Sequence, residues 1–285
     1  MNRFKTLMLM SLMTGLFLLV GGLIGGSAGM LIAFLFAAGT NLFAYWNSDR
    51  LLLSMYGARQ VDEQSAPDLV HIVERLARQG GLPVPKVFIA ENPQPNAFAT
   101  GRNPDHAALC VTSGLLSKVT QEELAGVIGH ELGHVKNRDT LTMTITAVMA
   151  GAIGMLANFA FFMGDRRNPL GLIGTLLVTL LAPIAALLVQ AAVSRAREFE
   201  ADRLGAELTG RPLWLANALT AIDSSAKVIP NLAADANPAT AHLFIVNPLH
   251  GNFAGLFASH PPTEERIARL RQMAGVQVQA KGPWG

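Results

Sequence analysis

A mainly α-helical membrane protein with four hydrophobic helices and a split α+β domain is the fold class that the sequence predicts. Of its 285 residues, 51% are hydrophobic and only 15% are charged, whereas ordinary soluble domains carry about 25% charged residues. The hydrophobic residues gather in long runs over 7–46, 140–163 and 170–193. Between these runs the sequence has the shorter patterns of ordinary helices and strands.

The first run contains no charged residue between positions 7 and 46. One helix of that length would measure about 60 Å, twice the roughly 30 Å hydrocarbon thickness of a bilayer. Glycines cluster over Gly21–Gly29, where a turn needs permissive backbone and where small residues let two helices approach. We therefore predict spans of about 7–24 and 28–46. A cleaved signal peptide is the alternative, but its apolar region usually covers only about 7–15 residues.

The second pair of runs, 140–163 and 170–193, is separated by a short loop with two arginines, Arg166 and Arg167. Each run is long enough to cross a bilayer. A buried hairpin of a soluble domain is the alternative, because the loop is charged. Basic residues beside the N-terminus and beside the split domain outnumber these two arginines, so the positive-inside rule predicts a domain that faces the cytoplasm.

The sequence divides into a first hairpin (1–46), one domain in two parts (47–139 and 194–285) and a second hairpin between them (140–193). Apolar residues at helical or strand spacing, bounded by Gly, Pro and Asn, predict the elements of that domain. The expected strands are Lys86–Ala90, Ala97–Thr100 and Ala107–Thr112, and the expected helices are Asp68–Gln79, Gln121–Asp139, 195–209, 212–226 and 263–273.

The charge balance and the cysteine content exclude two classes of interpretation. The net charge is only +2 and the basic residues form no stripe with interleaved aromatics, so nucleic acid is not an expected partner. Cys110 is the single cysteine, which excludes an internal disulfide. We expect Cys110 to be buried, because it lies in an apolar strand.

The chemistry begins with His130-Glu131-Leu132-Gly133-His134, which matches the pattern H-E-x-x-H. Residues four apart share a helix face, so both imidazoles can reach one ion. Glu131 is then placed to act as a general base on water. Zinc suits imidazole and carboxylate ligands, and a catalytic site needs a third protein ligand. The alternative is a helix with two ordinary surface or core histidines.

The second hairpin selects the third ligand. The histidine helix is expected to continue through Asp139 into this hairpin, whose antiparallel return brings the next segment beside the histidines. Glu198 and Asp202 share a face there, whereas Glu200 points about 200° away from Glu198. We predict that Glu198 ligates the metal and that Asp202 accepts a hydrogen bond from a ligating histidine. Glu200 as the ligand, and an ordinary pair of surface carboxylates, are the alternatives.

Three motifs together resemble one family of membrane proteases: HELGHVKNRD at His130–Asp139, REFEAD at Arg197–Asp202 and SHPP at Ser259–Pro262. They are similar to the HtpX-type zinc protease, which is grouped with the CAAX prenyl protease and the Oma-type proteases as gluzincins. The resemblance implies a zincin-like catalytic domain, one Zn²⁺ per chain held by His130, His134 and Glu198, and Glu131 as the base. It also implies that His260 is catalytic, donating to the transition-state oxyanion. By position alone, His260 could equally cap or pack against a helix.

A short strand before the catalytic helix is also expected to be functional. The resemblance includes the stretch Asn96-Ala97-Phe98-Ala99-Thr100-Gly101. An exposed edge there, at Asn96, Ala97, Phe98 and Ala99, could bind an extended substrate as an added strand through main-chain hydrogen bonds. A plain core strand is the alternative.

These observations predict a zinc metalloendopeptidase embedded in the cytoplasmic (inner) membrane as a multi-pass protein. Its expected partners are the lipid bilayer and protein substrates, mainly misfolded or damaged membrane proteins, as in the quality-control and stress-response role of the HtpX-type family. One alternative is a CAAX-type processing protease, although four spans are few for that branch. The other is a non-catalytic scaffold that binds zinc, although such a scaffold would not need Glu131.

Overall fold

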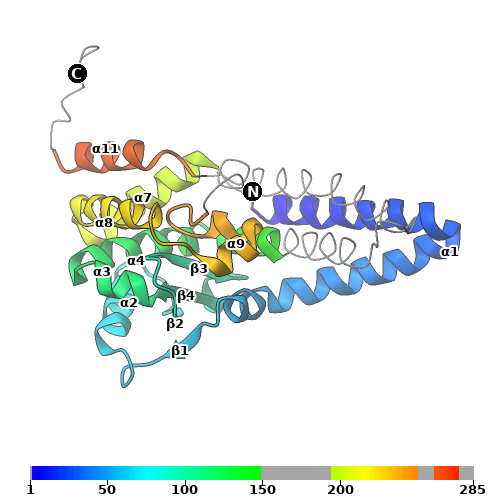
Figure 1. The fold of residues 1–285 in the computed structure, drawn as a ribbon, viewed down its shortest axis with the longest axis horizontal. Helices are drawn as coiled ribbons and strands as arrows, with labels where there is room; N and C mark the ends of the chain where they lie inside the picture. The colour runs from blue at the N-terminus through cyan, green and yellow to red at the C-terminus, as the bar shows by residue number, and fades with distance from the viewer. Residues whose placement is uncertain (1, 149–193, 250–259, 276–285) are drawn as a thin grey trace, which may run out of the picture.

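The computed structural model describes residues 2–148, 194–249 and 260–275. Figure 1 shows α1 (Asn2–Met55), in blue, folded back on itself and projecting from one end of a domain that contains the sheet. The fold-back lies at Gly25 and Gly26, whose backbone angles leave the helical region. The predicted turn within the glycine cluster is therefore confirmed.

Polar and small residues join the two arms of α1. The amide of Asn41 donates to the hydroxyl oxygen of Thr14 over 2.9 Å. A Cβ added to Gly21 would lie 2.5 Å from the carbonyl oxygen of Gly29, so only glycine permits the arms to come this close. The second arm, Gly25–Met55, is the one described helix long and apolar enough to cross a membrane, and a shorter apolar helix precedes it. Apart from residues 140–148, the predicted second hairpin lies outside the described residues.

Four strands form the sheet in the order β1-β2-β4-β3. The inner pair, β2 and β4, is parallel, and the outer strands β1 and β3 run antiparallel to their neighbours. The edge strand β3 lies next to helix α4 (Gln121–Lys136), which carries His130 and His134. The bounds are Arg59–Val61 for β1, Lys86–Ala90 for β2, Ala97–Gly101 for β3 and Ala107–Thr112 for β4.

Both faces of the sheet are covered, which explains why β4 has no polar alternation. Leu109 and Val111 face a core formed with helices α2, α4 and α8. Phe98 and Cys110 face a second core that includes Tyr56, at the end of α1, and residues from 140–148. Cys110 is fully buried, as predicted.

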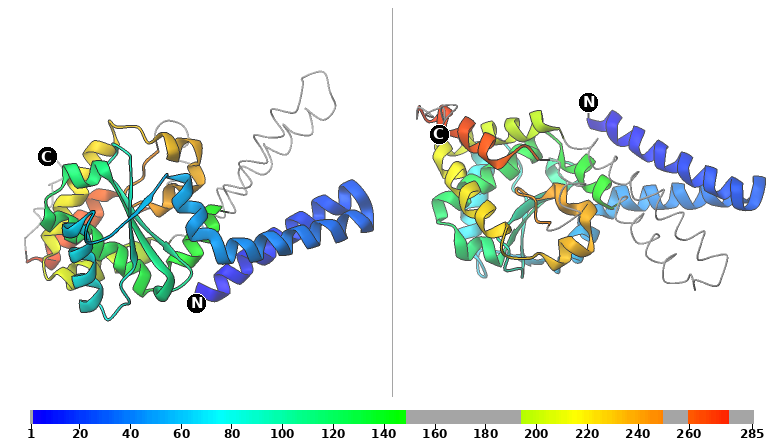
Figure 2. Two further views of the ribbon diagram at one scale, coloured as in Figure 1. Left: turned by 90° about the horizontal axis from the view of Figure 1, so that it is seen from below. Right: turned by 45° about the horizontal axis from the view of Figure 1, so that its top comes forward.

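The helices surround this sheet as the two views in Figure 2 show. The predicted helices over 195–209, 212–226 and 263–273 are confirmed, whereas β1, α3, α9 and the 3-10 turns were not predicted because they are short. The remaining bounds are α2 (Pro67–Gln79), η1 (Pro104–His106), α3 (Ser113–Lys118), α4 (Gln121–Lys136), α7 (Arg195–Thr209), α8 (Pro212–Ala226), α9 (Leu232–Ala236), η2 (Pro238–Leu243) and α11 (Thr263–Met273).

One prediction about α4 is wrong. The helix ends at Lys136 and does not continue through Asp139 into the next hydrophobic segment; residues 137–139 break it before helix resumes at 140. Arg138 takes a left-handed conformation with φ of 57°. This turn folds the chain back, so that the backbone N–H of Asp139 donates to the carbonyl oxygen of His134 over 3.0 Å.

Helices α4 and α7 pack at backbone contact. A Cβ on Gly205 of α7 would lie 2.7 Å from the backbone nitrogen of His130, and one on Gly133 of α4 would lie 3.0 Å from the Cα of Ala201. Larger residues would force the two helices apart. This contact places the N-terminal turn of α7, with Glu198, beside the histidines of α4, as the predicted return of the chain requires.

Candidate metal centre

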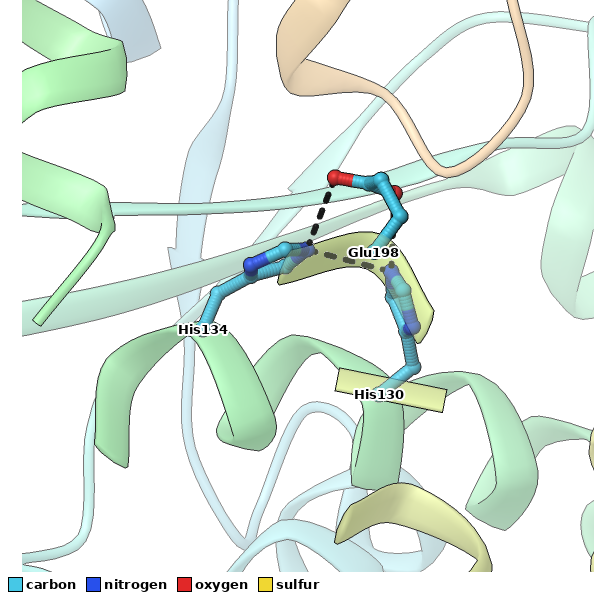
Figure 3. Close-up of side chains that lie close together, drawn as sticks. All are labelled: His130, His134 and Glu198. Carbon is cyan, nitrogen blue, oxygen red and sulfur yellow. Dashed lines mark hydrogen bonds and ion pairs between the residues drawn. The ribbon is translucent and has the colours of Figure 1, made fainter. Parts of the chain in front are cut away.

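Three buried side chains converge at the crossing of α4 and α7. Figure 3 shows the imidazoles of His130 and His134 on one face of α4, with the Glu198 carboxylate reaching them from α7. Each offers one ligand atom, and these atoms all lie within 4.8 Å of one another. All three side chains are at least nine-tenths buried.

The hydrogen bonds of the two imidazoles fix where their lone pairs point. Nδ1 of His130 lies 2.9 Å from the Asp202 carboxylate, and Nδ1 of His134 lies 3.3 Å from the Asp139 carboxylate. A carboxylate can only accept from a ring nitrogen, so each Nδ1 carries its proton and donates it. Each neutral ring then keeps a lone pair on Nε2, and the two Nε2 atoms face each other across 3.2 Å.

This arrangement fits a zinc ion. When both rings are neutral, two lone pairs and a carboxylate meet at this point and repel one another unless a cation lies between them. Nε2 of His134 is 3.6 Å from Oε1 of Glu198, and Nε2 of His130 is 3.9 Å from Oε2. Tetrahedral zinc with bonds of about 2.0–2.2 Å needs ligand atoms roughly 3.3–3.6 Å apart. These distances run to the two different oxygens of Glu198; with one ligand atom taken from each residue, all three lie within 4.8 Å of one another, which is close enough for a single ion to draw them together.

An arginine supports each of the two aspartates. Arg266 of α11 makes a two-pronged contact with Asp202, with nitrogen–oxygen distances of 2.9 and 2.7 Å. Arg197 of α7 donates to Asp139. The centre therefore contains two chains of the same chemistry, His130–Asp202–Arg266 and His134–Asp139–Arg197.

Sequence reasoning found only part of these two chains. Asp202 was predicted to accept from a ligating histidine, and it lies against His130. Asp139, Arg197 and Arg266 were missed, although each lies in or just after one of the three quoted motifs. The position of Asp139 about one turn beyond His134 could have indicated this contact. The predicted continuous helix, however, would have directed the Asp139 side chain away from His134.

The two imidazoles differ in their proton affinity before metal binds. Burial lowers the pKa of His130 to about 4, because the charge on Arg266 adds to the desolvation and together they outweigh Asp202. Burial alone would also lower the pKa of His134, but the charge on Glu198 and the hydrogen bond to Asp139 raise it to about 9. His134 is therefore the imidazole that carries an extra proton at neutral pH in the metal-free centre.

The two acidic groups on α7 stay ionised despite their burial. Burial raises the pKa of Asp202, but the charge and hydrogen bonds of Arg266 more than offset this and lower it to about 2. Burial likewise opposes ionisation of Glu198, and the charges of His260 and His134 hold its pKa well below its usual range. Both groups are thus available as anions, one toward the metal position and the other toward His130.

Glu131 lies one position beyond His130 and is 1% exposed. The backbone N–H of Ala99 on β3 donates to its carboxylate. Its Oε1 is buried and has no hydrogen-bond partner among the described residues. Burial raises the pKa of Glu131 to about 7, mainly by desolvation. One oxygen is thus anchored, while the other is left to exchange a proton.

His260 and Glu200 occupy different environments. Nδ1 of His260 lies 2.9 Å from Oε2 of Glu198, and its Nε2 is buried with no partner in the described part of the chain. Glu200 is 42% exposed and pairs with Arg203 on the surface of α7. The structure therefore gathers His260 into the centre and leaves Glu200 outside it.

The predicted substrate strand lies at the sheet edge, but most of that edge is already occupied. Asn96, Ala97, Phe98 and Ala99 are all buried. The carbonyl of Ala97 accepts from the N–H of Ile245, and the Asn96 amide donates to the Val246 carbonyl. Because the backbone N–H of Ala99 already donates to Glu131, a substrate strand could pair with this edge only from the Ala99 carbonyl toward Gly101.

Two histidines that could hold a metal from one helix, a glutamate that could hold it from a second helix and a buried glutamate beside them fit a zinc metallopeptidase of the gluzincin class. Residues 63–274 match the model of peptidase family M48. The chain belongs to this family of zinc metalloproteases. The crystal structure of S. mikatae Ste24p matches with 18% identity and a TM-score of 0.49, over 94% of this chain. The match covers 65% of the Ste24p chain, so this chain spans a little under two thirds of that length.

Proposed function

We propose that this chain is a membrane-bound zinc endopeptidase that cleaves misfolded or damaged membrane proteins at the cytoplasmic face. The observation that carries the catalytic part is the Glu131 carboxylate, buried beside three convergent ligand atoms with one oxygen unpartnered among the described residues. A site that held zinc only for structure would gain nothing from burying this carboxylate.

His130, His134 and Glu198 would hold the zinc ion. When bound, zinc supplies Lewis-acid activation of the attacking water and of the scissile carbonyl. Asp202 and Asp139 keep each Nδ1 protonated, so that each Nε2 lone pair faces the metal position. Both lone pairs become available to the metal once His134 has lost its extra proton.

Glu131 moves the proton. Its anchored oxygen fixes the carboxylate plane, and Oε1 accepts the proton of the attacking water and later gives it to the leaving amine. A pKa of about 7 serves both steps, because the group is partly ionised at neutral pH and yields its proton readily.

The test of this role is Glu131→Gln. The amide cannot take a proton, and the metal ligands are untouched, so we expect zinc to remain near one per chain while casein cleavage falls at least a thousandfold. Zinc content and cleavage are measured on the same preparation in detergent, with Glu200→Gln as the matched control. Appreciable activity in Glu131→Gln would remove it from the mechanism.

His260 is proposed to donate from Nε2 to the oxyanion of the transition state. The Glu198 carboxylate accepts a hydrogen bond from Nδ1 and so orients the ring. Donation from Nε2 then requires a proton on each ring nitrogen. Removing one such donor typically lowers kcat by about 10²–10³-fold. We therefore expect His260→Ala to cleave slowly with little change in KM and a near-normal melting temperature. A destabilised protein with normal turnover would indicate a packing role instead.

The membrane location and substrate class rest on the hairpin. Its apolar arms join the catalytic domain directly, and Thr6 on the first arm bonds Thr142, which follows the catalytic helix, over 3.0 Å. A site so close to the bilayer suits loops of membrane proteins.

Cysteine labelling at Val228, 80% exposed on the domain surface, tests the orientation. In a Cys110→Ser background, an impermeant maleimide should reach a cysteine at this position only in inverted membrane vesicles. In proteoliposomes, a destabilised membrane substrate should be cleaved faster than its folded form, and a prenylated CAAX peptide should not be preferred.

A further inference from the structure

A cavity of about 770 Å³ lies where the α1 hairpin meets the catalytic domain, on the His134 side of the metal centre. Its wall carries three arginines and two carboxylates, so its formal charge is positive. The carboxylates, moreover, face arginines: Asp139 bonds Arg197, and Glu200 bonds Arg203. The lining includes Thr6, Leu7, Met10, Tyr45, Arg102, Asn103, Arg138, Asp139, Leu141, Arg197 and Glu200.

An apolar groove of about 510 Å³ between the two arms of α1 runs into this cavity. The two share Leu7, Met10 and Tyr45 in their walls, so they adjoin at these side chains. Beyond these residues the groove follows the arms past Leu18 and Leu42. One end of the combined space is therefore cationic and the other is lined mainly by apolar side chains.

We propose that this space binds an anionic membrane phospholipid, with its headgroup phosphate at Arg102 and Arg138 and one acyl chain along the groove. The proposal rests on the membrane location proposed above. Guanidinium groups bind phosphate through paired, charge-assisted hydrogen bonds. A free phosphate ion would use the arginines but not the groove, whereas a lipid uses both, which is why we favour the lipid.

The backbone of Arg138 suits this residue to an experimental test. Arg138 is the one residue other than glycine, in the described part of the chain, with a positive φ. A left-handed conformation costs a side-chain-bearing residue stability that glycine would not lose. Arg138 also takes part in an interaction within the protein, and the five N–H donors of its guanidinium allow it to contact a phosphate in addition.

This strain makes Arg138→Gly an informative variant. It deletes the guanidinium and relieves the backbone, so its melting temperature should equal or exceed that of the wild type. Arg102→Gln is the second variant; its guanidinium lies 4.8 Å from the Trp46 ring centroid, at the hairpin wall. Arg78→Gln is the matched control, because Arg78 is exposed on α2 and lines neither space.

The experiment measures lipid binding to delipidated full-length protein in detergent by native mass spectrometry. Dioleoyl phosphatidylglycerol should bind at least tenfold more tightly than dioleoyl phosphatidylcholine. Each cavity variant should weaken phosphatidylglycerol binding by about fivefold, as expected for one basic residue at an anionic lipid surface. Arg78→Gln should bind like the wild type. Equal affinity for the two lipids, or wild-type binding by Arg138→Gly, overturns the proposal.

Two further arms separate the alternatives. Glycerol phosphate, which has the anion without the chains, should bind at least tenfold more weakly; equal binding would mean a simple anion site and would overturn the lipid assignment. If Arg138→Gly instead raised the KM of a soluble peptide in lipid-free detergent, the cavity would be a substrate subsite and the proposal would fail. Because lipid binding is also measured on Glu131→Gln, it can succeed or fail independently of the proposed protease activity.

Discussion

The two ligating histidines are supported by the same chemistry in two different places. Asp202 and Arg266, which support His130, have side chains only 5% and 1% exposed. Arg266 also donates to the carbonyl of Ile245 over 2.6 Å, so it ties α11 and the segment beside β3 to the metal centre. Asp139 is also buried, but Arg197 is 19% exposed and both line the cavity at the hairpin junction.

This difference indicates which side of the centre is rigid. His130 is held by a network whose every member is enclosed in the catalytic domain. His134 is held by a turn, residues 137–139, that exists only where the domain meets the hydrophobic segments. The candidate metal position therefore has one histidine fixed by the core and another whose orientation depends on the junction with the hydrophobic segments.

Removing the two arginines should separate the two sides most strongly. Arg266→Met leaves Asp202 as a buried anion without its partner, which typically costs about 3–5 kcal/mol. Arg197→Met removes a partner that is itself 19% exposed, and Asp139 keeps its hydrogen bond from His134, so we expect a smaller loss of about 1–3 kcal/mol. The free energy of unfolding is measured by denaturant titration followed by tryptophan fluorescence. Equal losses in the two variants would contradict the comparison.

Replacing each of the two aspartates by asparagine removes its charge but keeps a side chain of the same size behind the histidine. Loss of a carboxylate behind a ligating histidine typically lowers metal affinity by about 10–100-fold. We expect Asp202→Asn, at the shorter contact, to lie near the upper end and Asp139→Asn near the lower end. Zinc affinity is measured by competition with a chelator of known strength, with Asp235→Asn, exposed on α9, as the control. A larger effect at Asp139 would place the rigid side of the centre at the junction.

The smallest expected effect is a difference in proton release. At pH 7 the metal-free His134, with a pKa of about 9, holds an extra proton, whereas His130, with a pKa of about 4, does not. Both rings must be neutral to bind zinc, so binding should release about one proton and weaken as the pH falls below about 9. Asp139→Asn removes one cause of the raised pKa and should reduce the release, while Asp202→Asn should leave it unchanged.

Calorimetry of zinc binding in two buffers with different heats of ionisation measures this release. Asp202→Asn, whose proton release should stay at the wild-type value, serves as the internal control, because it makes the same substitution behind the other histidine. An equal reduction of the proton release in both variants would mean that the two histidines do not differ in proton affinity, which would contradict the electrostatic part of the comparison.

The sequence by itself determined the features that depend on neighbouring residues, such as which side chains share a helix face and where the helices and strands lie. The spacing of His130 and His134 places both on one helix face wherever that helix lies, and the spacing of Glu198 and Asp202 does the same on α7. Hydrophobic periodicity also located β2, β4 and the helices α7, α8 and α11 closely, since burial of one face repeats with the period of the element. The glycine cluster located the turn of α1, because only glycine permits such backbone angles and such close helices.

Only the tertiary structure decided how these elements support one another. The turn at Arg138 opposes the intrinsic preference of arginine, so no local rule predicts it, yet it brings Asp139 back to His134. Arg266 lies 64 residues from Asp202 in sequence and reaches it because α7, α8 and α11 pack together. The outer edge of β3 was predicted to be free, but Ile245 and Glu131 already occupy it. Such partners come from distant segments, and their meeting depends on packing that periodicity along the chain does not encode.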